Sequence, residues 1–181
     1  MKLERPEKYL SLFFTKGISL KNWVELGILD REKSLYETLL EKKKFEKIYW
    51  FTYGSSDKEI AESLYKKNLL NKNIIVVPKN KIFKGRFLET VYSKILIFIH
   101  FSKIKKSNLL KSNQVNGSWT ALIGKVIFNK PFFLRCGYLI SRSEKIWKRR
   151  NKLSIKIMQL IEKLVFTYCD VSTVSNEGDQ R

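Results

Sequence analysis

Short runs of β-branched, aromatic and other apolar residues recur along the chain, separated by longer segments with helical periodicity. Such runs, when glycine, proline or polar residues bound them, are typical of strands. They predict six strands, at residues 9–15, 47–53, 74–77, 109–110, 132–135 and 171–174. The IIVV run at 74–77 is apolar throughout and stops at Pro78, which favours a strand buried on both faces of a parallel sheet.

The segments between these runs place apolar residues three and four positions apart, which predicts amphipathic helices. We expect one helix to start at Asp30 as its N-cap, and one to start at Ser56, which forms a capping box with Glu59. A third is expected over residues 87–99, a fourth after a cap at Ser118, and a long one over residues 145–167.

Strands that alternate with helices over the whole length predict an α/β protein. We expect a Rossmann-like, mostly parallel sheet of about six strands with helices on both faces. Residues 1–181 suffice for one such domain and require no second core. Ser175 and Asn176 resemble the start of a further helix, so we also expect that this domain is truncated before a second one.

The composition sets limits on function. A formal net charge of +19 attracts anions, whether nucleic acid, anionic lipid or phosphorylated substrates, although abundant lysine, asparagine and isoleucine can also reflect an AT-rich genome. No RRM, KH, helix-turn-helix or zinc-finger pattern is present, so we expect no specific nucleic-acid partner. Cys136, Cys169 and His100 are the only cysteines and histidine, which argues against a metal site and favours a cytoplasmic location.

Polar loops are expected to meet beyond the carboxyl ends of the strands, where ligands bind in such sheets. Gly17 permits a tight turn and Ser19 adds a hydroxyl, in a loop that matches neither GxGxxG nor a P-loop. An ordinary turn is the alternative. Asn113, Gln114 and Asn116 place amides after the fourth strand, where they suit sugar hydroxyls. The alternative is a set of Asx turns leading into a helix cap.

Two further groups of residues carry possible chemistry. Arg135 ends the fifth strand, where a guanidinium can clamp a phosphate or carboxylate or form a structural ion pair. Cys136 beside it has no histidine nearby in sequence, which argues against a nucleophile. Basic residues surround Trp147, a mixture suited to an anionic membrane surface or to a solvated helix face. They are Lys145, Lys148, Arg149, Arg150 and Lys152.

Five segments follow one another along the chain: KGISLKNWVELGILDREKSLYETL, FTYG, LLKSNQVNGSWTALIGK, KPFFLRCGY and CDVSTVSNEGD. Together they make the chain resemble the N-terminal domain of bacterial glycosyltransferases of family 4. The resemblance implies one half of a GT-B enzyme, with retaining, metal-independent transfer from a nucleotide sugar in the synthesis of surface polysaccharide or glycolipid. By position, Gly17 and Ser19 would lie near the donor phosphates. Asn113, Gln114, Arg135 and Tyr138 would lie near the acceptor or the reacting sugar.

The resemblance also implies partners. This half would bind a sugar or lipid-linked glycan acceptor, and a C-terminal GT-B domain, in the same or a separate polypeptide, would hold the nucleotide-sugar donor. No other cofactor is expected, and this chain by itself should be inactive. Many relatives place a histidine after the fifth strand, where this sequence has Arg135, Cys136 and Gly137, so the catalytic residues stay unassigned. The alternative is a stand-alone, non-catalytic module that binds glycans or a protein partner. A cytoplasmic protein, peripheral on the inner membrane face, is expected.

Overall fold

The computed structural model describes residues 7–137, 139, 141 and 152–175. Its centre is a six-stranded sheet in the order β3-β2-β1-β4-β5-β6, in which all neighbouring strands are parallel. The strands are β1 (Tyr9–Phe13), β2 (Lys47–Phe51), β3 (Ile74–Val77), β4 (Leu109–Ser112), β5 (Phe132–Cys136) and β6 (Val171–Val174). The predicted Rossmann-like α/β class is thereby confirmed.

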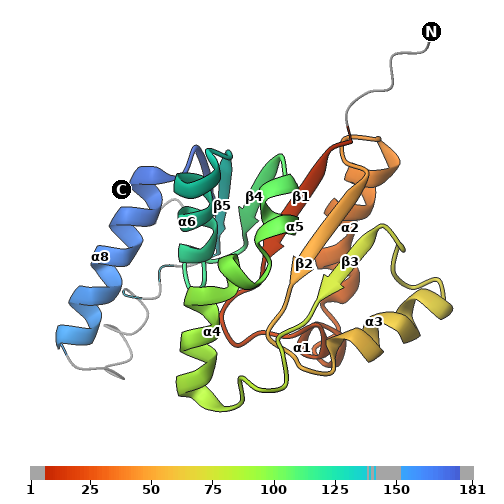
Figure 1. The fold of residues 1–181 in the computed structure, drawn as a ribbon, viewed down its shortest axis with the longest axis horizontal. Helices are drawn as coiled ribbons and strands as arrows, with labels where there is room; N and C mark the ends of the chain where they lie inside the picture. Colours follow the sequence, from red (N-terminus) through yellow and green to blue (C-terminus); the bar gives the residue numbers. More distant parts are fainter. Residues whose placement is uncertain (1–6, 138, 140, 142–151, 176–181) are drawn as a thin grey trace, which may run out of the picture.

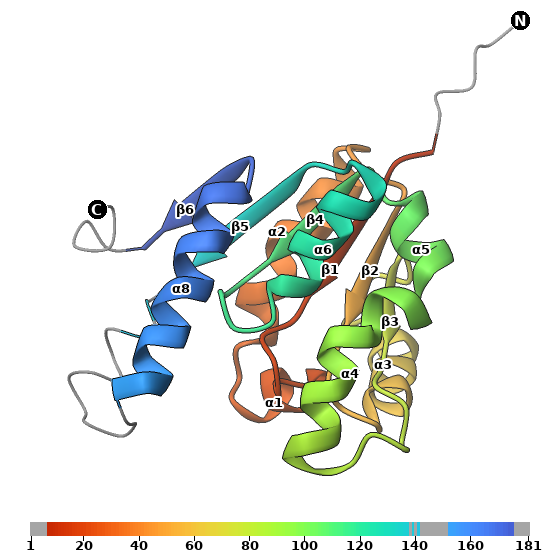
Figure 2. The same cartoon turned by 60° about the vertical axis from the view of Figure 1, so that its left-hand side comes forward.

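Helices cover both faces of this sheet (Figure 1, Figure 2). One face carries α4 (Gly85–Ile99), α5 (Phe101–Lys106), α6 (Trp119–Phe128) and α8 (Lys152–Tyr168). The other carries α2 (Leu29–Glu41) and α3 (Asp57–Lys66), with the short α1 (Leu20–Glu25) beside them. The sequence did not predict α1, and the expected helix over 145–167 is described only from Lys152 onward.

The core under α2 is aromatic. Trp50 of β2 is fully buried and makes edge contacts with Trp23 of α1 and Tyr36 of α2, while Phe14 stacks on Trp23 at a centroid distance of 4.0 Å. This cluster fixes α1 and α2 against the carboxyl half of the sheet. Over β5 and β6 the same face has no described helix, and Val171 is exposed there.

Three predicted helix caps differ from the structure. Asp30 is not an N-cap: α2 begins at Leu29, and Asp30 pairs with Lys33 in the first turn. Ser56 and Glu59 form no capping box, because the Ser56 side chain makes no cap hydrogen bond. Ser118 does occupy the N-cap position of α6, but its hydroxyl donates to the carbonyl of Val115.

Asp57, beside Ser56, makes a tertiary contact in place of that local cap. Its buried carboxylate accepts hydrogen bonds from the backbone N–H groups of Leu20 (2.8 Å), Lys21 (3.2 Å) and Gly54 (3.2 Å). An added Cβ at Gly54 would lie 2.2 Å from this carboxylate. Asp57 therefore joins the start of α3 to the start of α1 and sets the shape of the loops at the carboxyl edge.

The outer face of α8 exposes an apolar stripe. Leu153, Ile157, Leu160 and Leu164 follow one another at helical spacing, and Leu153 and Leu160 are 68% and 57% exposed. In the part of the chain that the structure describes, no helix combines the length and apolar content needed to cross a bilayer.

Candidate functional site

The loops after β1 and β4 lie side by side at the carboxyl edge of the sheet. The backbone N–H of Lys16 donates to the carbonyl of Asn116 at 3.0 Å. Gly17 has φ +82°, as its predicted role in a tight turn requires. Gly117 has φ +101°, and an added Cβ there would lie 3.0 Å from the Lys16 nitrogen, so the contact depends on this glycine.

Ser19 performs a structural task. Its hydroxyl accepts from the backbone N–H of Asn22 at 3.1 Å and donates to the Asn22 side chain at 2.7 Å, while that side chain accepts from the Ser19 backbone. This reciprocal arrangement is a capping box at the start of α1. The Ser19 hydroxyl is thus engaged within the fold.

A hollow of about 530 Å³, here called the arginine hollow, brings three predicted site residues together. Asn113 and Gln114 come from the loop after β4, and Arg135 comes from the end of β5. The full lining is Thr15, Ile18, Trp23, Leu26, Ile28, Arg31, Glu32, Asn113, Gln114, Arg135 and Gly137. Two arginines, two amides and an apolar wall therefore surround one space.

Glu32 connects these groups across the hollow. Its buried carboxylate accepts from Arg31 at 2.9 Å, from Arg135 at 3.1 Å and from the Asn113 side chain at 3.5 Å. The Arg135 side chain is nevertheless 49% exposed, because no described helix covers β5 on this face. Glu32 stands in the first turn of α2 and was not predicted as a site residue from the sequence.

Beneath Asn113 lies a lysine buried in the sheet. Lys111 of β4 is 3% exposed, and its ammonium donates to the Tyr36 hydroxyl at 3.1 Å and to Oδ1 of Asn113. The Tyr36 hydroxyl also donates to Oδ1 of Asn113, at 3.3 Å. Since Oδ1 is taken by these two donors, the Asn113 NH₂ group is directed toward Glu32 and the hollow.

Burial acts on the pKa of Lys111. Desolvation, with the nearby positive charge of Arg135, lowers the pKa of this amine to about 7, while Glu32 acts in the opposite direction. Burial also raises the pKa of Tyr36 well above its ordinary value, so its hydroxyl stays protonated. Near neutral pH this part of the site therefore exchanges a proton at Lys111.

Gln114 lies against the segment that follows β5. Its Oε1 is 3.9 Å from the Sγ of Cys136, and an added Cβ at Gly137 would lie 2.7 Å from its Nε2. Nε2 donates no hydrogen bond within the described residues, so this amide can donate into the hollow. Cys136 is buried, and the single histidine of the sequence, His100, packs against Phe51.

Gly17 and Asn116 lie in a different recess from Asn113, Gln114 and Arg135. They line a groove of about 390 Å³ between the loop after β1, α6 and α8. The loop after β4 contributes to both spaces, but the two sets of predicted residues do not share one. Tyr138 and most of the basic cluster, Lys145, Lys148, Arg149 and Arg150 with Trp147, lie outside the described residues.

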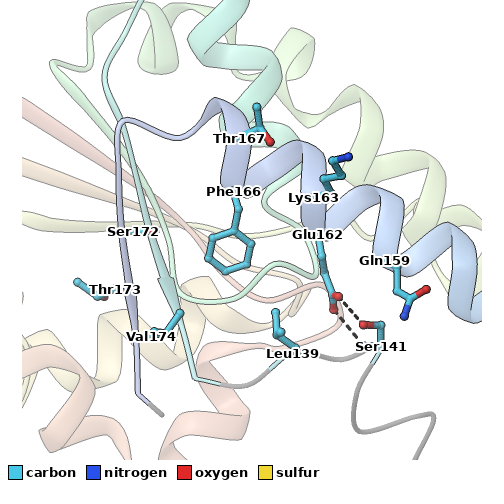
Figure 3. Close-up of a pocket in the computed structure, with 10 residues that line it drawn as sticks. All are labelled: Leu139, Ser141, Gln159, Glu162, Lys163, Phe166, Thr167, Ser172, Thr173 and Val174. Atoms are coloured by element: carbon cyan, nitrogen blue, oxygen red, sulfur yellow. Dashed lines mark hydrogen bonds between the residues drawn. The ribbon is translucent and has the colours of Figure 1, made fainter. Parts of the chain in front are cut away.

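A third recess, of about 960 Å³, lies between α8 and β6 and contains none of the predicted site residues (Figure 3). Glu162 of α8 points at Ser141 and accepts from its backbone N–H at 2.9 Å and from its hydroxyl. Phe166 and Val174 supply apolar lining. The visible role of Glu162 is to hold Ser141 against α8.

His100 lies between α4 and α5, away from these spaces. Burial lowers its pKa to about 4, and its ring contacts Phe51 at a centroid distance of 5.3 Å. It is therefore a neutral packing residue near pH 7. Among the described side chains, no group of three from His, Cys, Asp and Glu is placed to hold a metal ion.

No protein-family model matches the sequence, and no curated protein matches it significantly. Among solved structures, the fold is similar to a protein described as a UDP-N-acetylglucosamine 2-epimerase from Listeria monocytogenes, with TM-score 0.53, 12% identity, and coverage of 94% of this chain and 39% of that one. MurG of Acinetobacter baumannii follows, with TM-score 0.47, 8% identity, and coverage of 92% and 41%. A protein of unknown function from Vibrio parahaemolyticus has TM-score 0.45, 10% identity, and coverage of 94% of both chains.

The likeness to the epimerase shows the fold and, at 12% identity, nothing finer. This chain spans about two fifths of the length of the epimerase and of MurG.

Proposed function

We propose that this chain is the acceptor-binding, N-terminal half of a retaining glycosyltransferase that acts in surface polysaccharide or glycolipid synthesis. The observation that carries the proposal is the arginine hollow, in which Asn113, Gln114 and Arg135 meet at the carboxyl edge of the sheet. The Gln114 amide and the Asn113 NH₂ group can hydrogen-bond sugar hydroxyls, and the apolar wall suits the face of a sugar ring. The fold likeness to a sugar-nucleotide epimerase supports a sugar-handling role in coarse outline.

In this proposal the nucleotide-sugar donor binds to another domain. A second Rossmann-like domain, in the same polypeptide or a separate one, would hold the nucleotide sugar and face the hollow. Gly17, beside Asn116 in the neighbouring groove, would approach the donor phosphates from this side. The chain would then contribute acceptor binding, and catalysis would need both halves.

We expect Gln114→Ala to weaken sugar binding with little loss of stability. The side chain of Gln114 faces the hollow and is only partly buried, so its removal costs little packing. Losing one well-placed hydrogen bond costs about 1 kcal/mol, or roughly fivefold in affinity, and about tenfold or more where a buried partner is left unpaired. Titration of the ¹⁵N-labelled chain with methyl glycosides, followed by NMR, gives the affinity, and a melting curve on the same sample gives the stability.

Gln159→Ala is the matched control, because Gln159 is an exposed glutamine on α8 that lines the recess beside β6. It should change neither quantity. If Gln114→Ala instead lowers the melting temperature and leaves sugar binding intact, Gln114 braces the loop after β4 and the proposed site is wrong.

We further propose that the acceptor is presented at an anionic membrane surface, which α8 contacts. Its exposed stripe of Leu153, Leu160 and Leu164 is accompanied by Lys156 and Lys163 on the same helix. An exposed apolar stripe with flanking lysines is typical of interfacial helices, whose binding combines apolar burial with attraction to anionic lipid.

Vesicle flotation tests this contact. Anionic vesicles should recover more of the chain than neutral ones, and added salt should release it because salt screens the lysines. Leu160→Gln should reduce recovery, whereas Ile82→Gln, at a still more exposed apolar position in the loop after β3, should not. Equal recovery on neutral and anionic vesicles would remove the membrane role.

A further inference from the structure

The charges around the arginine hollow do not balance. Arg31 and Arg135 both pair with Glu32, which is the only acidic residue lining the hollow among those described. Two guanidinium groups facing one carboxylate leave a net positive charge, and the Lys111 amine lies directly beneath. The nearest described acidic neighbour along α2, Asp30, is turned outward to Lys33.

The geometry leaves donors of Arg135 available. Among the described residues Glu32 is its one hydrogen-bond partner, and it takes the Nη1 atom. A guanidinium carries five N–H donors in a planar fork that matches the two oxygens of a carboxylate or phosphate. Because the side chain is half exposed and lines the hollow, these donors are open to a ligand there.

Glu32 holds that fork in place and limits its motion. The carboxylate is buried and receives hydrogen bonds from Arg31, Arg135 and Asn113, so it ties α2 to the end of β5 and to the loop after β4. A fixed guanidinium loses less side-chain entropy when it binds an anion than a free one does. The same carboxylate orients the Asn113 NH₂ group, a neutral donor on the same wall of the hollow.

We propose that the arginine hollow takes a sugar that carries an anionic substituent, a carboxylate or a phosphate, which Arg135 binds while Asn113 and Gln114 bind its hydroxyl groups. This assignment rests on the proposed sugar-binding function and adds the class of acceptor. Neutral sugars are then the weaker ligands, because they leave the Arg135 donors without an anion.

The test compares a neutral sugar, two sugars that carry an anionic group, and an anion without a sugar. Methyl glucuronide, methyl glucoside, glucose 1-phosphate and inorganic phosphate are titrated into the ¹⁵N-labelled chain at constant ionic strength. At least one of the two anionic sugars should bind about tenfold more tightly than methyl glucoside, the scale of one charge-assisted hydrogen-bond pair. A preference for glucuronide identifies a carboxylate, and a preference for glucose 1-phosphate identifies a phosphate.

Arg135→Gln should remove that preference, so that the variant binds methyl glucoside and the anionic sugars with similar affinity. Arg135→Lys, which keeps the charge and loses the fork, should retain only part of the preference. Lys66→Gln removes one exposed charge at the end of α3 and is the matched control for long-range electrostatics. The amide spectrum of each variant reports whether it is folded.

The outcomes separate the two proposals. Equal affinity for methyl glucoside and both anionic sugars, or a preference that survives Arg135→Gln, overturns the anionic acceptor and leaves sugar binding standing. Where glucose 1-phosphate is the preferred sugar, inorganic phosphate that binds as tightly overturns the anionic acceptor as well, since the sugar then contributes nothing. If none of the sugars binds, the proposed function fails with it.

Discussion

Asp57→Ala is expected to destabilise the chain by about 3 kcal/mol, because it removes a buried carboxylate that accepts three backbone hydrogen bonds. The N–H of Leu20 is buried and would lose its partner, whereas those of Lys21 and Gly54 lie nearer to water. In a domain of this size the change corresponds to roughly 10 °C in melting temperature. Urea unfolding and a melting curve measure it.

Asp57→Asn separates shape from hydrogen bonding. Both carboxylate oxygens accept from backbone N–H groups, so either orientation of the amide places its NH₂ against a donor. We therefore expect a loss close to that of the alanine variant. Asp30→Ala is the matched control, since its side chain is 89% exposed, and its stability should stay within about 0.5 kcal/mol of wild type. A wild-type-like Asp57→Ala would show that α1 is held by other contacts.

The strands were predictable because their apolar runs follow from burial between two layers of helices. Ile74–Val77 is the clearest case: its four residues are apolar, and the structure begins and ends β3 at the predicted residues. Right-handed connections between parallel strands then leave few arrangements open, and the observed order is one of them. The α/β class thus follows from local pattern, whereas the strand order comes from the structure.

Helix starts were less predictable because their polar partners come from distant segments. The sequence around Ser56 favours a capping box at the start of α3, but this box does not form. The next residue, Asp57, instead accepts a hydrogen bond from the backbone N–H of Leu20 at the start of α1, 37 positions away. Conversely, the sequence predicts that the Ser19 hydroxyl belongs to a ligand-binding loop, whereas in the structure it forms a capping box with Asn22. Local rules do not reveal which of two neighbouring polar residues is used over a long range.

The hollow was predicted in part. Asn113, Gln114 and Arg135 follow strands, and strand ends meet at one edge of a parallel sheet. Glu32 was missed because a charged residue in the first turn of a helix is ordinarily exposed. The signal available was its spacing of four from Tyr36, which places both on the buried face of α2.

Lys111 was missed for a related reason. A lysine ends an apolar run, so the sequence stops the strand at Leu110, whereas β4 continues through Ser112. The parallel register then places Lys111 between Leu12 of β1 and Phe133 of β5. Lys111 is buried because strands from other parts of the chain lie on both sides of it, and the residues next to it in the sequence do not indicate this.

Lys111→Met is expected to remove a pH dependence from the stability of the fold. In the folded chain the pKa of Lys111 is about 7, against an ordinary value of 10.5 in the unfolded chain. Between these values the unfolded chain binds the proton and the folded chain does not, so stability rises with pH, by at most about 1.4 kcal/mol per pH unit. Methionine fills a similar volume and does not titrate, so the variant lacks this rise.

This linkage determines which of the two proteins, wild type or Lys111→Met, is the more stable at a given pH. At and below pH 7 the wild-type chain bears the full cost of burying the charge, and Lys111→Met should be the more stable of the two. The advantage should shrink as pH increases from 7 toward 10.5, because wild-type Lys111 becomes neutral in both states only above that value. Tyr36 and Asn113 keep their mutual hydrogen bond in the variant, so the substitution leaves neither of these side chains without a partner.

Urea unfolding of both proteins at several pH values between 7 and 9.5 measures the effect. Other titrating groups, such as His100 with its pKa of about 4 and Cys169 with its raised pKa, are common to both chains and cancel in the difference. Lys94→Met, at an exposed position of α4, is the matched control and should run parallel to wild type. Parallel curves for wild type and Lys111→Met would mean that Lys111 keeps its proton when folded, and the burial argument for this site would then be wrong.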